Sequence, residues 1–247
     1  MTHPFEVKGE IALDATPDEV WEAIATGPGI DTWLMGRNEV EPREGGTTRM
    51  TMGDFTQEGT VTAWDPGHRF ASRGTEGPDG SVHAFEYLIE GREGGSTMLR
   101  FVHSGFMGND WEAEYEALQK GWGMYLDKLT EYFTHFRGRK ATPISAMVPA
   151  KDDEGDVVQR LREGLGLTGP PSVGDRVRLT PEGFAPIDGV VDYVAGDFLG
   201  VRTDDAMYRF IRGYAGGVVL GHHLFAEGVD QPATEQAWQE WLTKLFA

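Results

Sequence analysis

The chain has 247 residues, enough for one large domain or two small ones. Its 40 aspartates and glutamates outnumber its 22 lysines and arginines. No cluster of basic residues is long enough to bind along a phosphate backbone, so we expect an acidic protein with no nucleic-acid partner. Because the chain contains no cysteine, disulfides, thiolate metal sites and thiol nucleophiles are excluded.

The N-terminal segment alternates apolar and other side chains over residues 5–13, which predicts a strand with one buried face. This stretch has neither the basic start nor the apolar core of a signal peptide. No segment approaches about 20 consecutive apolar residues. We therefore expect a cytoplasmic protein without membrane insertion.

A helix is predicted to begin at Pro17, because Thr16 can cap it and Asp18 and Glu19 suit its first turn. The sequence Gly27-Pro28-Gly29 is expected to end this helix, before a second short helical piece over residues 30–35.

The next segments have β character and are separated by glycine, proline and aspartate, as in an antiparallel meander. They are residues 47–52, 56–64, 69–73, 82–90 and 97–103. Residues 110–136 then place apolar side chains three or four apart, which predicts a long amphipathic helix. This order predicts an α+β fold of the helix-grip type, in which an antiparallel sheet wraps around the long C-terminal helix.

The second half repeats this order in shorter form, so we predict two units in tandem. Residues 1–140 form the first, 141–155 a linker without periodicity, and 156–247 a degenerate helix-grip-like domain. The expected elements of the second unit are a helix at 156–165, strands at 176–179, 187–194, 198–202, 207–212 and 218–225, and a helix at 232–246.

The repeat also shows in the residues, since Gly59-Thr60-Val61 before Phe70 is echoed by Gly189-Val190-Val191 before Phe198. No counterpart of the first strand is evident in the second unit. We therefore expect it to pack on the first unit, to complete its sheet through a neighbour, or to form a homodimer. Its interior is expected to be filled.

Five motifs occur in a familiar order: 41–46 (EPREGG), 59–61 (GTV), 65–70 (DPGHRF), 103–106 (HSGF) and 121–122 (GW). Over residues 2–136 the chain resembles the Aha-type branch of the SRPBCC superfamily, a START-like group named after an activator of the Hsp90 ATPase. The resemblance implies a seven-stranded antiparallel sheet that grips the C-terminal helix, with two small helices closing a cavity. Relatives of this kind bind lipids, hormones or polyketides, and a few act as cyclases or hydrolases.

Strand parity and helical spacing predict which side chains line such a cavity. They are mostly aromatic, with few polar anchors, as suits a flat apolar or aromatic ligand. The predicted lining residues are Trp33, Met35, Met52, Val61, Phe85, Tyr87, Ile89, Leu99, Phe101, His103, Trp122, Tyr125 and Leu129. A filled core is the alternative for each of them.

No catalytic set is recognisable. His103 and Tyr87 are the candidates for proton transfer, although we favour a structural role for a lone histidine. Glu112, Glu114 and Glu116 are interpreted as a solvated face. We expect no cofactor and no metal, because His222 and His223 are strand neighbours that point to opposite sides.

These patterns, together with what the family resemblance implies, leave three functions open. The first is binding or carrying a small hydrophobic or aromatic molecule in the N-terminal unit. The second is a polyketide-cyclase-like or hydrolase-like enzyme that uses the same cavity, with His103, Tyr87 or Tyr125 assisting proton transfer. The third is an interaction module acting on an ATPase or chaperone.

Overall fold

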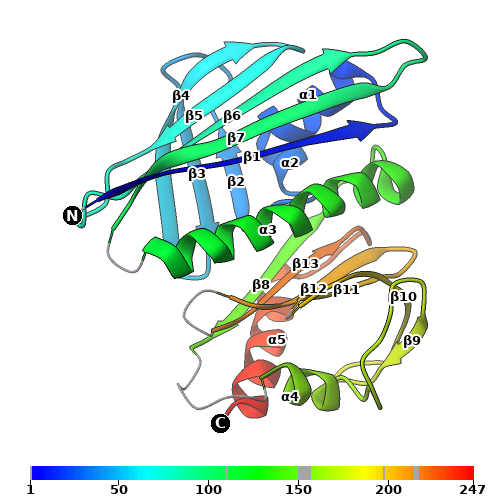
Figure 1. Ribbon diagram of the computed structural model, residues 1–247. Helices are drawn as coiled ribbons and strands as arrows, with labels where there is room; N and C mark the ends of the chain where they lie inside the picture. The colour runs from blue at the N-terminus through cyan, green and yellow to red at the C-terminus, as the bar shows by residue number, and fades with distance from the viewer. Residues whose placement is uncertain (1, 109–110, 150–156, 197, 214–216) are drawn as a thin grey trace. The chain divides into compact units, whose positions relative to one another are not determined.

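The computed structural model describes residues 2–108, 111–149, 157–196, 198–213 and 217–247. The chain divides into two units, Met1–Lys140 (unit 1) and Ala141–Ala247 (unit 2). Each is an α+β unit built from one antiparallel sheet and one long helix (Figure 1). The two-unit α+β fold expected from the sequence is therefore confirmed.

Unit 1 holds a seven-stranded sheet in the order β1-β7-β6-β5-β4-β3-β2, and all neighbouring strands are antiparallel. The sheet bends so that β2 and β3 run across the direction of β6 and β7, and α3 passes along its open side (Figure 1). The strands are β1 (His3–Leu13), β2 (Arg37–Val40), β3 (Thr47–Met52), β4 (Phe55–Asp65), β5 (Arg69–Gly74), β6 (Val82–Gly91) and β7 (Thr97–Met107).

Helix α1 (Pro17–Ala25) begins where the sequence predicts, with a capping box between Thr16 and Glu19. The prediction for the second helix is wrong, since α2 comprises Gly27–Ile30 and not residues 30–35. The Thr26 hydroxyl accepts a hydrogen bond from the Gly29 N–H, so Gly-Pro-Gly begins this helix and does not end the first one.

The long helix α3 (Trp111–Glu131) continues into a π-helical turn, η1 (Tyr132–Phe136). Asp110, where the helix was expected to begin, lies outside the described residues. Trp122, Tyr125 and Leu129 are buried along one stripe of α3. No helix in the described part of the chain combines the length and the apolar character needed to cross a membrane.

Unit 2 repeats this plan with a six-stranded sheet in the order β8-β13-β12-β11-β10-β9. Its apolar core lies between the sheet and the helices, around Trp238, Trp241 and Leu242 of α5. The elements are β8 (Thr142–Val148), α4 (Val157–Gly164), β9 (Arg176–Leu179), β10 (Ile187–Ala195), β11 (Phe198–Arg202), β12 (Ala206–Arg212), β13 (Val218–Leu224) and α5 (Gln231–Leu245).

Strand β8 corrects two expectations. It lies within the predicted linker 141–155, and it is the counterpart of the first strand that unit 2 was expected to lack, because it pairs with β13 as β1 pairs with β7. The prolines at 143 and 149 concealed it, since proline is tolerated on an edge strand where one row of N–H groups needs no partner strand. Residues 150–156 of the predicted linker lie outside the described part.

The two units share details that explain the echo in the sequence. A register shift follows Val61 in β4 and Val191 in β10, so each strand carries a bulge at the same place. The Val61 carbonyl accepts from Gly45 N at 2.9 Å, and the Val191 carbonyl accepts from Gly174 N at 2.8 Å. Strand β9 therefore corresponds to β3, and the described residues of unit 2 include no counterpart of β2.

Candidate functional site

The interior of unit 1 is built first by strands β6 and β7. Their register places Phe85 opposite His103, Tyr87 opposite Phe101 and Ile89 opposite Leu99. Because alternate residues of a strand share a face, all six side chains lie on one side of the sheet. These are six of the residues predicted to line a cavity.

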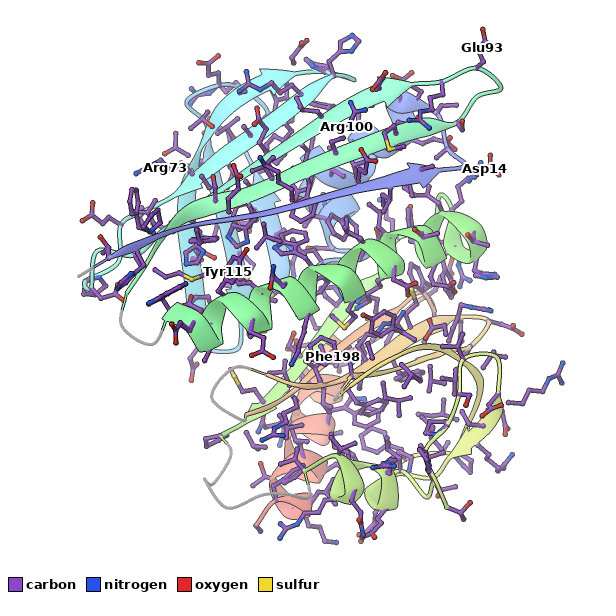
Figure 2. All side chains as sticks on the ribbon, in the orientation of Figure 1. Asp14, Arg73, Glu93, Arg100, Tyr115 and Phe198 are labelled. Atoms are coloured by element: carbon purple, nitrogen blue, oxygen red, sulfur yellow. The ribbon has the colours of Figure 1, made fainter. Side chains whose placement is uncertain are left out.

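Trp122 of α3 connects the helix to this face of the sheet. Its indole ring lies 4.2 Å from the Phe101 ring and 6.2 Å from the rings of Phe85 and Tyr125, measured between centroids. His103 stacks on Phe85 at 4.2 Å. Side chains from the sheet and from α3 fill the space between them (Figure 2).

Two further aromatic side chains join this network without having been predicted. Phe70 of β5 stacks on Tyr87 at 6.2 Å, and Phe5 of β1 meets His103 edge-on at 5.0 Å. Both residues follow the inward alternation of their own strands, which is the signal that would have found them. The cluster of aromatic side chains therefore involves β1, β5, β6, β7 and α3.

The other predicted lining residues fall into two groups. Trp33, Val61 and Leu129 are fully enclosed, and the Trp33 indole N–H donates to the Ala23 carbonyl at 2.9 Å. Met35 and Met52 are only half-buried.

Two tyrosine hydroxyls in this interior have no hydrogen-bond partner among the described residues. The side chains are those of Tyr87 on β6 and Tyr125 on α3, which are 4% and 9% exposed. Burial raises the pKa of both hydroxyls, so both stay protonated. Each can donate one hydrogen bond and accept another.

Two other buried hydroxyls of unit 1, by contrast, are paired. The Thr97 hydroxyl donates to the Ala15 carbonyl at 2.7 Å, and the Thr32 hydroxyl donates to the Gly29 carbonyl at 2.6 Å. Buried polar groups in proteins are normally paired, and one that is not paired calls for a ligand, a water or another explanation.

His103 is held from two sides. The Trp122 indole N–H donates to His103 Nδ1 at 2.9 Å, and His103 Nε2 lies 3.0 Å from His83 Nδ1. An indole nitrogen can only donate, so Nδ1 of His103 is the acceptor and the proton of the neutral ring sits on Nε2. That proton points to His83, whose own proton then occupies Nε2.

The chain of contacts ends at Glu114 of α3, whose Oε1 lies 3.9 Å from His83 Nε2. Burial lowers the pKa of His83 and raises the pKa of Glu114. The sequence analysis does not single out His83, and it interprets Glu114 as part of a solvated face. The signal for His83 was its strand parity, which it shares with Phe85 and Tyr87.

This geometry does not favour His103 as a catalytic base. Both of its ring nitrogens are engaged, and burial together with the neighbouring His83 lowers its pKa to about 3. Tyr87 keeps its proton and can donate a hydrogen bond. This interior therefore presents two protonated tyrosine hydroxyls among aromatic rings.

An open pocket of about 330 Å³ lies elsewhere in unit 1, between α2 and β2. None of the residues predicted to line a cavity contributes to it. Burial raises the pKa of its Asp31, whose carboxylate accepts hydrogen bonds from Asn38. The lining residues are Gly27, Pro28, Asp31, Arg37, Asn38, Glu39 and Val40.

The corresponding interior of unit 2 is occupied by its own side chains. Phe184, from the loop before β10, stacks on Trp238 at 4.0 Å. His222 lies edge-on to Trp238 at 4.7 Å, but its Nδ1 accepts from the Arg209 backbone N–H. Among the described residues no group of three or more histidines, aspartates and glutamates is placed to hold a metal ion.

A comparison with known protein families gives a match within unit 1. Residues 14–134 match the family model of activator of Hsp90 ATPase homolog 1-like proteins. A search of curated proteins finds no significant match.

Several solved structures resemble the chain in fold. MLL2253 from Mesorhizobium loti is 22% identical, with 51% of this chain and 95% of that chain aligned and a TM-score of 0.46. The Aha1 dimer from Colwellia psychrerythraea is 20% identical, with 52% and 96% aligned and a TM-score of 0.43. DynU16, from the dynemicin biosynthetic locus, is 18% identical, with 97% and 96% aligned and a TM-score of 0.46.

Proposed function

Unit 1 is a member of the activator of Hsp90 ATPase homolog 1-like family, and we propose that its interior binds a small, largely apolar molecule that carries a polar group. The observation that carries this proposal is that Tyr87 and Tyr125 are buried side chains whose hydroxyls form no hydrogen bond with a described residue. A carbonyl or hydroxyl group on a ligand would supply the missing partner.

The surroundings of the two hydroxyls support an aromatic ligand. Phe101 and Trp122 lie between the two tyrosines in the network of ring contacts. Flat apolar molecules pack well on such rings, in stacked or edge-on arrangements. One or two hydrogen bonds would then fix the orientation of the ligand.

The first test looks for a retained molecule. The protein is purified from its own host, and its mass under native conditions is compared with its mass after denaturation. We expect a small molecule in the wild type that is reduced in Tyr87→Phe and Tyr125→Phe, which lose only the hydroxyl. Tyr115→Phe is the matched control, because that hydroxyl bonds the Glu6 carbonyl on the edge of the sheet (Figure 2).

The second test uses added probes, 2-naphthol and naphthalene, which differ by one hydroxyl. We expect the wild type to bind 2-naphthol about tenfold more tightly, as one hydrogen bond of about 1.4 kcal/mol would give. This preference should disappear in Tyr87→Phe or Tyr125→Phe and persist in Tyr115→Phe. A wild type with neither a retained molecule nor binding of either probe would contradict the proposal.

A further inference from the structure

The orientation of Trp122 depends on one hydrogen bond. Its indole packs against Phe101 and Phe85, and its N–H points away from this contact to Nδ1 of His103. His103 is 3% exposed and is held in turn by stacking on Phe85. The ring that would pack on a ligand is therefore fixed by a histidine that does not need to touch the ligand.

The two hydrogen bonds form a chain in which each residue donates to the next. Trp122 donates to His103, and His103 donates to His83. With both histidines neutral, only one placement of their protons satisfies the two bonds, because the indole can only donate. His83 is half-buried and lies at the end of this chain, beside Glu114. The chain thus leads from the interior of unit 1 towards the solvent.

We propose that His103 is a positioning residue for Trp122 and that protonation of His83 releases Trp122, so that ligand binding by unit 1 weakens in acid. The part about binding rests on the function proposed above. The structural part, a tryptophan held by a chain of two neutral histidines, stands on the contacts alone.

The effect of an added proton follows from the direction of the chain. A proton on Nδ1 of His83 turns this acceptor into a charged donor, which bonds His103 most strongly if Nε2 of His103 becomes an acceptor. The proton of His103 then moves to Nδ1, where it faces the Trp122 N–H. Two donors meet, and the bond that holds the indole is lost.

The charged groups around His83 come from two other segments. Asp79, in the loop before β6, opposes the lowering of the His83 pKa by burial, and Glu114 of α3 lies beside Nε2. On the strand side its neighbours are Phe5 of β1 and Gly105 of β7, which carry no charge. Both carboxylates favour the protonated form of His83, and burial opposes it.

Unit 2 offers an internal comparison. His222 contacts the rings of Tyr208 and Trp238, much as His103 contacts the rings of Phe85 and Trp122. The Nδ1 of His222 accepts from the Arg209 backbone and not from the indole. A change at His222 therefore alters a histidine in the matching place without touching a histidine–tryptophan hydrogen bond.

The direct test needs no ligand. Nitrogen-15 NMR resolves the indole N–H signals of the seven tryptophans, and Trp122→Phe assigns one of them. We expect the Trp122 signal to be protected from solvent exchange at about pH 7 and to lose protection in acid, below the ordinary histidine pKa of about 6.5. In His103→Gln, whose carbonyl accepts without titrating, the signal should stay protected; in His103→Leu it should not.

His222→Gln is the control and should leave the Trp122 signal and its pH profile unchanged. The other six indole signals report whether each variant is folded. The proposal is overturned if the Trp122 signal of His103→Leu matches the wild type, or if the signal of His103→Gln titrates as the wild type does.

Binding of 2-naphthol then tests the consequence for the ligand. We expect the affinity of the wild type to fall at least about tenfold between about pH 7 and pH 5, that of His103→Gln to change little, and that of His103→Leu to be low throughout. Equal affinity of His103→Leu and wild type would overturn the positioning role and leave the proposed function standing. If the indole signals behave as expected but 2-naphthol does not bind the wild type, the proposed function is the part that fails.

Discussion

At the scale of single residues, His103 links the interior of unit 1 to the stability of the protein. Its pKa in the folded protein is lowered to about 3, compared with about 6.5 in an unfolded chain. The unfolded state therefore takes up this proton first as the pH falls. The stabilising contribution is complete above about pH 6.5 and is lost between there and about pH 3.

We therefore expect the free energy of unfolding of the wild type to fall more steeply than that of His103→Gln between about pH 6.5 and pH 3. The difference in slope should approach about 1.4 kcal/mol per pH unit. Urea unfolding at a series of pH values measures both curves. Parallel curves would mean that His103 is not the group that resists protonation.

Gly200 of β11 makes room for an ion pair across three strands of unit 2. Arg209 of β12 bonds Asp192 of β10 through two nitrogens, at 3.0 and 2.8 Å, and both side chains are almost entirely buried. A Cβ at Gly200 would lie 2.5 Å from Asp192 Oδ1 and 2.7 Å from Arg209 Nη1. A larger residue there must displace the pair.

Gly200→Ala should lower the free energy of unfolding by about 1–3 kcal/mol, the usual cost of overpacking. Denaturant unfolding measures the loss. Gly169→Ala is the control, since a Cβ at that position meets nothing within 4 Å. Equal stability of the two variants would show that the sheet relaxes around the new methyl group.

The predictability of single residues depended on how many elements a contact involves. Trp122 and Tyr125 follow from helical spacing within one segment, and Tyr87 and Phe101 follow from strand parity. The bonds from His83 to His103 and Glu114 join two strands and a helix, and no local pattern contains all three.

At the scale of elements, α5 closes the open edge of β8 with side chains. Gln239 accepts from the Met147 N–H and donates to the Met147 carbonyl, both at 2.9 Å, as a partner strand would. Glu235 accepts from Ser145 N, and Gln231 donates to the Pro143 carbonyl. The spacing of four residues along α5 matches alternate residues of β8.

Gln239→Ala should leave the backbone N–H and carbonyl of Met147 without their hydrogen bonds to α5. Because Met147 is half exposed, water replaces part of the loss, and we expect a destabilisation of about 1 kcal/mol with faster hydrogen exchange at the Met147 amide. Gln236→Ala, which removes only a surface bond to Glu240, is the control. An unchanged exchange rate at Met147 would show that its N–H is protected in another way.

A substitution at Gly121 is expected to stabilise the protein. It lies inside α3, and a Cβ there would meet nothing within 4 Å. Gly121→Ala should therefore stabilise the protein by about 0.5–1 kcal/mol through helix propensity alone. A rise in the midpoint of thermal unfolding checks this, and a fall would reveal a contact that alanine disturbs.

Most strands were predicted well, but the edge strands β2 and β8 were not. The bounds of β3, β9 and β11 match the prediction, because alternation marks half-buried strands. The short, mostly exposed β2 shows little alternation, and the prolines around β8 suggested a linker. These two strands are held by long-range pairing, which local sequence patterns do not encode.

At the scale of the whole molecule, each unit has a core of its own. Leu129 of α3 and Leu242 of α5 are fully buried in units 1 and 2 respectively. Leu129→Ala and Leu242→Ala should each cost about 2–5 kcal/mol. Hydrogen exchange should show faster opening mainly within the unit that carries the change. Equal loss of protection in both units would mean that the chain unfolds as a single cooperative block.

The tandem arrangement was predictable because both halves show the same order of periodicities. The strand-by-strand correspondence of the two units was not predictable, because the first strand of unit 2 lies within the expected linker. Only the pairing of β8 with β13, and the shared bulges after Val61 and Val191, align the two units residue by residue.

That no described segment of unit 2 corresponds to β2 has an evolutionary consequence. Strand β2 ends the sheet of unit 1 and pairs only with β3. A deletion that removes a terminal strand leaves every other pairing in place, whereas losing an inner strand would force its two neighbours into a new register. In a duplicated domain, deletions should therefore be tolerated first at this edge strand. Related sequences should vary in length there before they vary elsewhere in the sheet.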